Sequence, residues 1–147
     1  MVNQSKHDIR HAVSDEDFAS VFPVMHVLRP QLASAGEFLS RARRQREQSG
    51  WRLIYVEDDE APVACAGFRI SEWLAWGKTL YVDDLVALES HRGKGFAEAL
   101  MRWMLEYAKA EGCAQFHLDS GTQRLPAHRF YYRLGLAITS FHFARTL

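Results

Sequence analysis

The sequence predicts an α/β fold in which a mixed, mostly antiparallel sheet carries helices on both faces. Stretches of strand-like alternation and stretches of helical spacing follow one another along the chain, and Gly, Pro and Asp residues separate them. The predicted order is β-α-α-β-β-β-α-β-α-β, which places helices on a sheet of this kind. No internal repeat or Pro/Gly-rich linker divides the 147 residues, so we expect one domain over residues 1–147.

The first third of the chain predicts a strand followed by two helices. A short strand is expected at His7–Val13. Ser14 then begins a helix, because its hydroxyl can cap free amides and three acidic residues follow it. Apolar residues recur at helical spacing until Pro30 interrupts them. A second helix is expected over Leu32–Gln48, with Gly50 as its stop.

The middle of the chain predicts three strands and the clearest helix of the sequence. The strands are expected at Trp51–Val56, Pro62–Ile70 and Leu80–Leu88. A continuous apolar stripe predicts a helix over Arg92–Glu111, and Gly112 ends it. These elements supply the central part of the sheet and the helix behind it.

The last third predicts two strands around a short helix. Gln115–Asp119 alternates as a half-buried strand does, and Pro126–Leu134 is expected to be helical, closed by Gly135. A last strand is expected at Ala137–Ala144, where aromatic and β-branched residues gather.

Composition excludes several classes of function. Acidic and basic residues balance at 18 each, which argues against a nucleic-acid partner. No apolar run approaches a membrane span, and Met1–Lys6 lacks a signal-peptide core, so we expect a cytoplasmic protein without a membrane partner. Cys65 and Cys113 provide neither a disulfide framework nor a thiolate metal site. Three histidines match no familiar metal-ligand spacing, and we expect no metal: His117, His128 and His142.

A glycine-bearing loop lies between a predicted strand and the strongest predicted helix. Gly93 and Gly95 allow the backbone to approach an anion, and Arg92 and Lys94 add positive charge. Free amides at a helix start favour phosphate groups. The pattern indicates a diphosphate site, although a glycine-eased turn alone would produce the same residues. The loop lacks the Gly-Lys-Ser/Thr ending of a nucleotide-triphosphate loop and the third glycine of a dinucleotide-binding loop.

Two segments resemble the GNAT family of N-acetyltransferases. The run Arg92-Gly93-Lys94-Gly95-Phe96-Ala97 resembles the family signature Arg/Gln-x-x-Gly-x-Gly/Ala, and Ala127–Leu136 resembles Ala-x-x-Phe-Tyr-x-x-x-Gly-Phe. The resemblance implies the GNAT fold, acetyl-CoA as co-substrate and coenzyme pyrophosphate bound by the six loop residues. It implies backbone contacts to the pantetheine arm from a bulged strand, here Leu85, Val86 and Ala87. Arg124 stands where family members often have Asn near the pantetheine arm. The resemblance therefore does not decide whether residue 124 contacts this arm.

The same resemblance implies the catalytic side chains. Tyr131 matches the family's general acid, and a phenol stays protonated at neutral pH. Tyr132 would point about 100° away on a helix. Asp83 matches the position where some members place a general base, whereas others deprotonate the amine through ordered water. On a regular strand Asp83 and Asp84 would face opposite sides of the sheet.

The predicted reaction is the direct attack of a primary amine on acetyl-CoA in a ternary complex. A small-molecule amine is favoured over a protein because no additional domain for peptide docking is evident. A catalytically silent acyl-CoA-binding module is the alternative. The family resemblance is compatible with a homodimer, but no residue pattern in the sequence indicates one. Four residues are candidates to line the acceptor entrance, although such residues are more often core: Met25, His26, Trp73 and Trp76.

Overall fold

The computed structural model describes residues 7–147; Met1–Lys6, on which the signal-peptide prediction rests, lie outside the described residues. Internal contacts divide the chain into two compact units, one ending at His117 and the other comprising Leu118–Leu147. Within the described part, no helix has both the length and the apolarity needed to cross a membrane.

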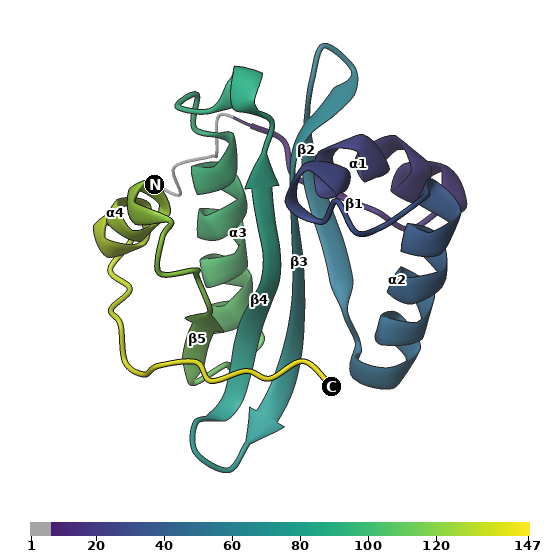
Figure 1. Ribbon diagram of the computed structural model, residues 1–147. Coiled ribbons are helices and arrows are strands. Elements are labelled where there is room, and N and C mark those ends of the chain that lie inside the picture. Colours follow the sequence, from purple (N-terminus) through teal and green to yellow (C-terminus); the bar gives the residue numbers. More distant parts are fainter. Residues whose placement is uncertain (1–6) are drawn as a thin grey trace. The chain divides into compact units, whose positions relative to one another are not determined.

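Five strands form one sheet, in which the spatial order equals the chain order (Figure 1). They are β1 (Arg10–His11), β2 (Arg52–Asp58), β3 (Ala61–Trp73), β4 (Gly77–Ala87) and β5 (Gln115–Leu118). The three pairs from β1 to β4 are antiparallel, as the sequence predicts. The predicted first strand is confirmed but is only two residues long.

Two helices precede the long strands, and side chains fix where each begins. α1 (Asp15–Leu28) starts at Ser14, which forms a complete capping box. α2 (Ala35–Ser49) starts three residues later than predicted, because the Ser34 side chain accepts an amide of its first turn. Gly50 ends α2 in the left-handed region, at φ 67°.

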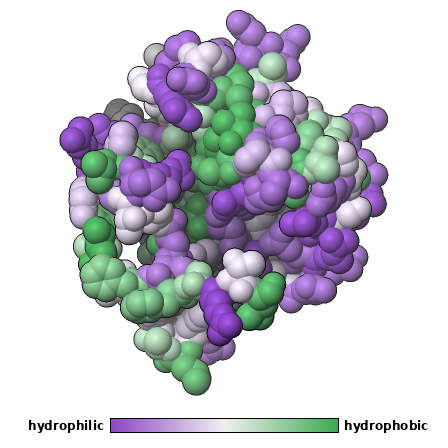
Figure 2. Space-filling view, viewed as in Figure 1, coloured by the Kyte–Doolittle hydropathy of each residue, from purple (hydrophilic) through white to green (hydrophobic). Residues whose placement is uncertain are grey.

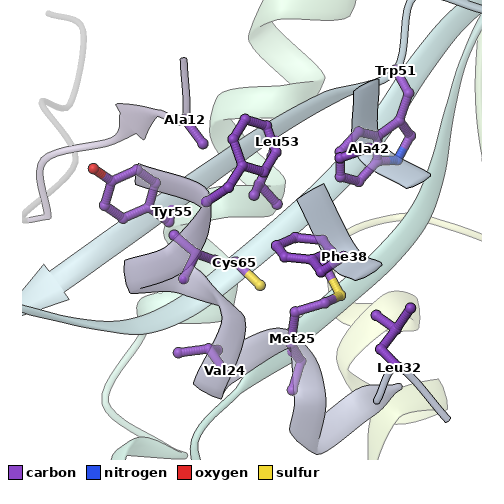
Figure 3. Close-up of a cluster of buried hydrophobic side chains, with 13 residues drawn as sticks. Ala12, Val24, Met25, Leu32, Phe38, Ala42, Trp51, Leu53, Tyr55 and Cys65 are labelled. Carbon is purple, nitrogen blue, oxygen red and sulfur yellow. The ribbon is translucent and has the colours of Figure 1, made fainter. Parts of the chain in front are cut away.

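The core has two layers, one on each face of the sheet. On one face α1 and α2 pack against inward side chains of β2 and β3 (Figure 3). This cluster contains Phe18, Val21, Val24, Met25, Phe38, Trp51, Leu53, Tyr55 and Cys65. On the other face lies α3 (Phe96–Ala110), where Phe68 of β3 meets Trp103 and Tyr107 at ring-centroid distances of 6.1 and 5.8 Å. Helices therefore cover both faces, as predicted.

The second unit contains α4 (Leu125–Arg133) and an extended C-terminal segment. Gly135, at φ 85°, donates to Tyr132 O, and Leu136 donates to Tyr131 O. These two bonds form a Schellman motif that ends the helix.

The predicted strand at Ala137–Ala144 is wrong. The structure assigns no strand to these residues, and Ile138, Phe141 and Phe143 are exposed. Ile138 and Phe141 are three residues apart, whereas side chains on one face of a strand are two apart. The apolar side chains of this segment would therefore be divided between the two faces of a strand. Residue type alone favoured a strand here, but a strand also requires a paired neighbour.

The side chains of Trp51 and Asp84 pack closely against Gly67 of β3. Gly67→Ala is therefore expected to destabilise the protein by about 1–3 kcal/mol. A Cβ at this position would lie 2.5 Å from Cζ2 of Trp51 and 2.6 Å from Oδ2 of Asp84. Neither group can move freely, because Trp51 is buried and Asp84 is ion-paired. Urea unfolding followed by circular dichroism measures the change.

Gly36→Ala is the matched control in α2. A Cβ there meets only Ser34 Oγ, at an ordinary 3.8 Å, and alanine favours a helix. We expect unchanged or higher stability for this variant. Equal unfolding midpoints for both variants would contradict the close packing around Gly67.

Candidate active site

A short turn joins β4 to the glycine-bearing loop. The 3-10 turn Glu89–His91 follows β4 after one residue, Leu88, and Arg92–Gly95 then lead into α3. Gly93 and Gly95 have φ values of 77° and 86°, a region that side-chain-bearing residues rarely adopt. The structure therefore brings Leu85–Ala87 and the loop together through a single turn.

The first turn of α3 presents amides that no side chain caps. α1 and α2 both have serine caps, but the N-cap of α3 is Gly95, which has no side chain to offer. The first helical bond of α3 runs from Ala99 N to Gly95 O, so the earlier amides have no carbonyl partner within the helix. Arg92 and Lys94 are exposed beside them. Amides, dipole and side chains together make a site for an anion.

The outer edge of Leu85–Ala87 lies beyond the reach of β5. The two strands come together near Lys78, whose carbonyl accepts from Ala114 at 2.7 Å. β5 has four residues, or about 13 Å at 3.3 Å per residue, whereas Leu85 lies seven residues beyond Lys78. Among the described strands, β5 is the neighbour of β4 on this side, and its four residues are too few to extend from Lys78 to Leu85. The backbone groups of Leu85–Ala87 can therefore bind an extended ligand.

The two adjacent aspartates of β4 lie on the same face of the sheet, and the expectation of opposite faces is wrong. The pairing with β3 shifts at this point: Gly67 is opposite Asp84, and Phe68 is opposite Val82. Asp83 is the extra residue of a bulge, and a bulge breaks the alternation of side chains. Both carboxylates consequently reach arginines on the α1–α2 face.

Asp83 belongs to a polar network centred on Arg69. Its Oδ2 accepts from Arg69 Nε at 2.9 Å, and the other two nitrogens of Arg69 donate to Ser49 Oγ and Gln45 Oε1, both at 2.6 Å. Burial raises the pKa of Asp83 above its ordinary value, although the Arg69 guanidinium opposes this shift. A carboxylate with a raised pKa is a better base at neutral pH.

Asp84 borders a pocket of about 140 Å³. Its Oδ1 accepts from Arg29 Nε at 2.9 Å, and Arg29 also donates to the backbone oxygen of Asp83. The pocket lies against α1, α2 and the start of β2, and its lining includes Met25, Gln31, Leu32, Gln45 and Trp51. Figure 2 shows hydrophilic residues gathered over α2, where Arg41, Arg43, Arg44 and Arg46 are exposed. Of these four arginines, Arg41 lines the pocket.

Tyr131 is half-buried on α4, whereas its neighbour Tyr132 is 52% exposed. The Tyr131 backbone carbonyl accepts the bond from Leu136 that closes the helix, which fixes the residue in place. Burial raises the pKa of Tyr131, and the charge of Arg124, the N-cap of α4, partly opposes this shift. The phenol therefore holds its proton throughout the neutral range.

Comparison with known proteins identifies this arrangement. Residues 17–136 match the Acetyltransferase (GNAT) family. The chain belongs to the GNAT family. It is an acetyl-CoA-dependent N-acetyltransferase, as the two sequence signatures predict.

Relatives of similar length support the assignment. The chain is 28% identical over 138 residues to the protein named uncharacterized N-acetyltransferase YhdJ from Bacillus subtilis (strain 168), covering 93% of this chain and 96% of that one. It is 26% identical over 132 residues to streptothricin acetyltransferase from Escherichia coli, covering 83% and 74%. The solved structure of AAC(6')-Iy in complex with a CoA bisubstrate analog shares the fold, with a TM-score of 0.81 at 16% identity and coverages of 97% and 99%.

Several site features of this GNAT chain have no clear signal in the sequence. Arg29 and Arg69 bind the bulge carboxylates from different elements, and only the fold reveals their partners. Trp51 Nε1 is buried without a hydrogen-bond partner in the described structure, next to Asp84. Within residues 7–147, no group of His, Cys, Asp or Glu side chains has the arrangement of a metal site.

Proposed function

We propose that the protein transfers the acetyl group of acetyl-CoA to a primary amine of a small molecule, by direct attack in a ternary complex. The observation that supports this most strongly is the succession of a bulged strand, an uncapped helix start and two glycines with positive φ. The family match spans parts of both units, which supports one catalytic domain over residues 1–147. We also propose that it acts in the cytoplasm.

The coenzyme is assigned to two backbone surfaces. The amides of Gly93–Ala97 would hold its diphosphate, because they donate to no backbone carbonyl of the described residues and lie at the positive end of α3. The Arg92 amide donates to Glu89 O, so Arg92 would contribute through its guanidinium. The open edge of Leu85–Ala87 would pair with the pantetheine arm and direct amides at the thioester oxygen, where negative charge develops. Arg124 is a further candidate for contact with this arm. No metal is needed for either surface.

Two side chains are assigned to proton transfer. Tyr131 would donate its proton to the departing thiolate, since burial keeps the phenol protonated. Asp83 would accept the proton of the amine, supported by its raised pKa. Asp84 is the second candidate for the base, because it rather than Asp83 lines the pocket. An ordered water between either carboxylate and the amine serves the same purpose.

The proposal that the acceptor is a small molecule is supported by the names of related proteins. Streptothricin acetyltransferase is named for a small-molecule substrate, and the AAC(6')-Iy complex contains an acetylneamine analog. The pocket beside Asp84, at about 140 Å³, is smaller than the roughly 300–1,000 Å³ of a whole small-molecule site. It would take the part of the acceptor that carries the amine.

Thiol release tests the proposal. Acetyl-CoA and the purified protein are incubated with amino sugars, aminoglycosides, polyamines, amino acids and short peptides, and free CoA is followed with a chromogenic disulfide. We expect release above the hydrolysis blank with one class of small amine. Release with peptides alone would overturn the small-molecule assignment.

Paired asparagine variants identify the base. If Asp83 is the base, Asp83→Asn is expected to lower kcat by about 100-fold, because the amide cannot accept the proton. Asp84→Asn is then expected to raise the acceptor KM and leave kcat within a few fold. Steady-state kinetics across pH measure both effects. The reverse ranking would assign the base to Asp84, and two small effects would favour ordered water.

A further inference from the structure

His7 lies against the loop that precedes α3. Its Nε2 is 3.2 Å from the backbone oxygen of Lys94, and its ring lies 4.3 Å from that of Phe96, centroid to centroid. The same nitrogen is 3.7 Å from the point where a Cβ on Gly95 would stand. His7 thus contacts Lys94 of the loop and Phe96, the first residue of α3. It precedes both the loop signature and the matched range 17–136.

The contact with Lys94 controls the direction of the next amide. The described residues contain no cis peptide, so the Lys94 carbonyl and the Gly95 N–H point in opposite directions across one plane. An Nε2–H of His7 that donates to the Lys94 oxygen therefore aims the Gly95 N–H away from the imidazole. Glycine tolerates many backbone angles, so this peptide would otherwise rotate easily.

The start of the loop is fixed by a different histidine. His91 Nε2 lies 3.2 Å from Asp58 Oδ2, at the end of β2, and His91 Nδ1 lies 2.8 Å from Ser90 Oγ. These contacts hold the 3-10 turn. They do not reach the peptide between Lys94 and Gly95, which His7 contacts from the other end of the loop.

We infer that His7 is a positioning residue for coenzyme binding: its hydrogen bond to the Lys94 carbonyl orients the Gly95 amide for a phosphate oxygen. This inference rests on the proposed function, in which the loop holds the diphosphate of acetyl-CoA. His7 acts through the Lys94–Gly95 peptide and not on the reacting atoms. Its loss therefore changes the affinity for the coenzyme and leaves the chemical step intact.

Two variants separate the hydrogen bond from the ring packing. His7→Phe keeps a ring against Phe96 but has no donor, whereas His7→Gln offers an amide N–H close to the position of Nε2. We expect His7→Phe to raise the Kd for CoA, measured by calorimetry, by about 5- to 10-fold, the range of one hydrogen bond. His7→Gln is expected to stay within about twofold of the parent protein. The acetyl-CoA KM should follow Kd, with kcat unchanged.

The outcomes distinguish this inference from the proposed function. Normal CoA affinity in His7→Phe would overturn the role of His7 while leaving the coenzyme site intact. Equal weakening in His7→Phe and His7→Gln would overturn the hydrogen bond as its cause. A fall in kcat at saturating acetyl-CoA would contradict a role confined to positioning. Absence of CoA binding by the parent protein would instead refute the proposed coenzyme site itself.

Discussion

Replacing Tyr131 by Phe is expected to lower kcat by about two orders of magnitude or more, with the affinity for acetyl-CoA little changed. The substitution removes only the hydroxyl that would protonate the departing thiolate, a contribution of about 10²–10⁴-fold for a general acid. The ring would still pack beside Phe130, 5.5 Å away, so the helix should remain intact. Steady-state kinetics and calorimetry with CoA measure the two effects separately.

Tyr132→Phe is the matched control. It removes the same hydroxyl from the next residue, whose side chain is 52% exposed, and we expect normal turnover. Unchanged kcat in Tyr131→Phe would exclude Tyr131 from the mechanism.

The pH profile of the parent protein provides a second test of the acid. Tyr131 must be protonated to act, and burial raises its pKa above 10.0. As pH rises, activity should therefore persist until the medium exceeds pH 10 and then fall as the phenol ionises. A loss of kcat centred near pH 8, absent from Tyr131→Phe, would indicate that Tyr131 titrates much lower than its burial implies.

Replacing Gly95 by Asp is expected to abolish measurable acetyl-CoA binding. Gly95 has φ 86°, which costs an ordinary residue about 1–2 kcal/mol. The new carboxylate would also stand at the amides assigned to the diphosphate and repel its charge. Calorimetry with CoA measures the loss, and circular dichroism checks that the variant is folded.

Gly112→Asp separates these effects. Gly112 has a similar φ of 75°, and a Cβ there meets nothing within 4 Å, so this variant adds the same strain and the same charge away from the loop. We expect Gly112→Asp to bind acetyl-CoA normally. Retained affinity in a folded Gly95→Asp variant would mean that the diphosphate lies elsewhere.

The elements that the sequence predicts well are those with local causes. Ser14, Gly50 and Gly112 act through their own side chains or backbone angles, so the ends of the helices near them could be read directly. Glycine spacing also indicated the loop Arg92–Gly95, but the predicted helix Arg92–Glu111 began four residues too early, since α3 starts at Phe96. The family match then confirmed the fold and the activity class.

The features that escaped prediction depend on pairing between distant segments. The family resemblance implied a bulged strand, but the position of the bulge at Asp83 depends on the register of β4 against Gly67, which no local pattern records. The predicted strand at Ala137–Ala144 failed for a related reason, since residue preference cannot supply a neighbouring strand. His7 and Arg29 reach the site across 87 and 55 residues of sequence, so their roles appear only in the fold.

Transfer of an isotopically labelled acetyl group tests the central claim most directly. The protein is incubated with acetyl-CoA deuterated in its acetyl group and with the best amine from the thiol-release panel, and the amine is then examined by mass spectrometry. The account predicts a product carrying one labelled acetyl group on nitrogen, formed in step with free CoA and strongly reduced in Tyr131→Phe. Bound acetyl-CoA with no labelled product from any amine would contradict it and indicate a silent coenzyme-binding protein.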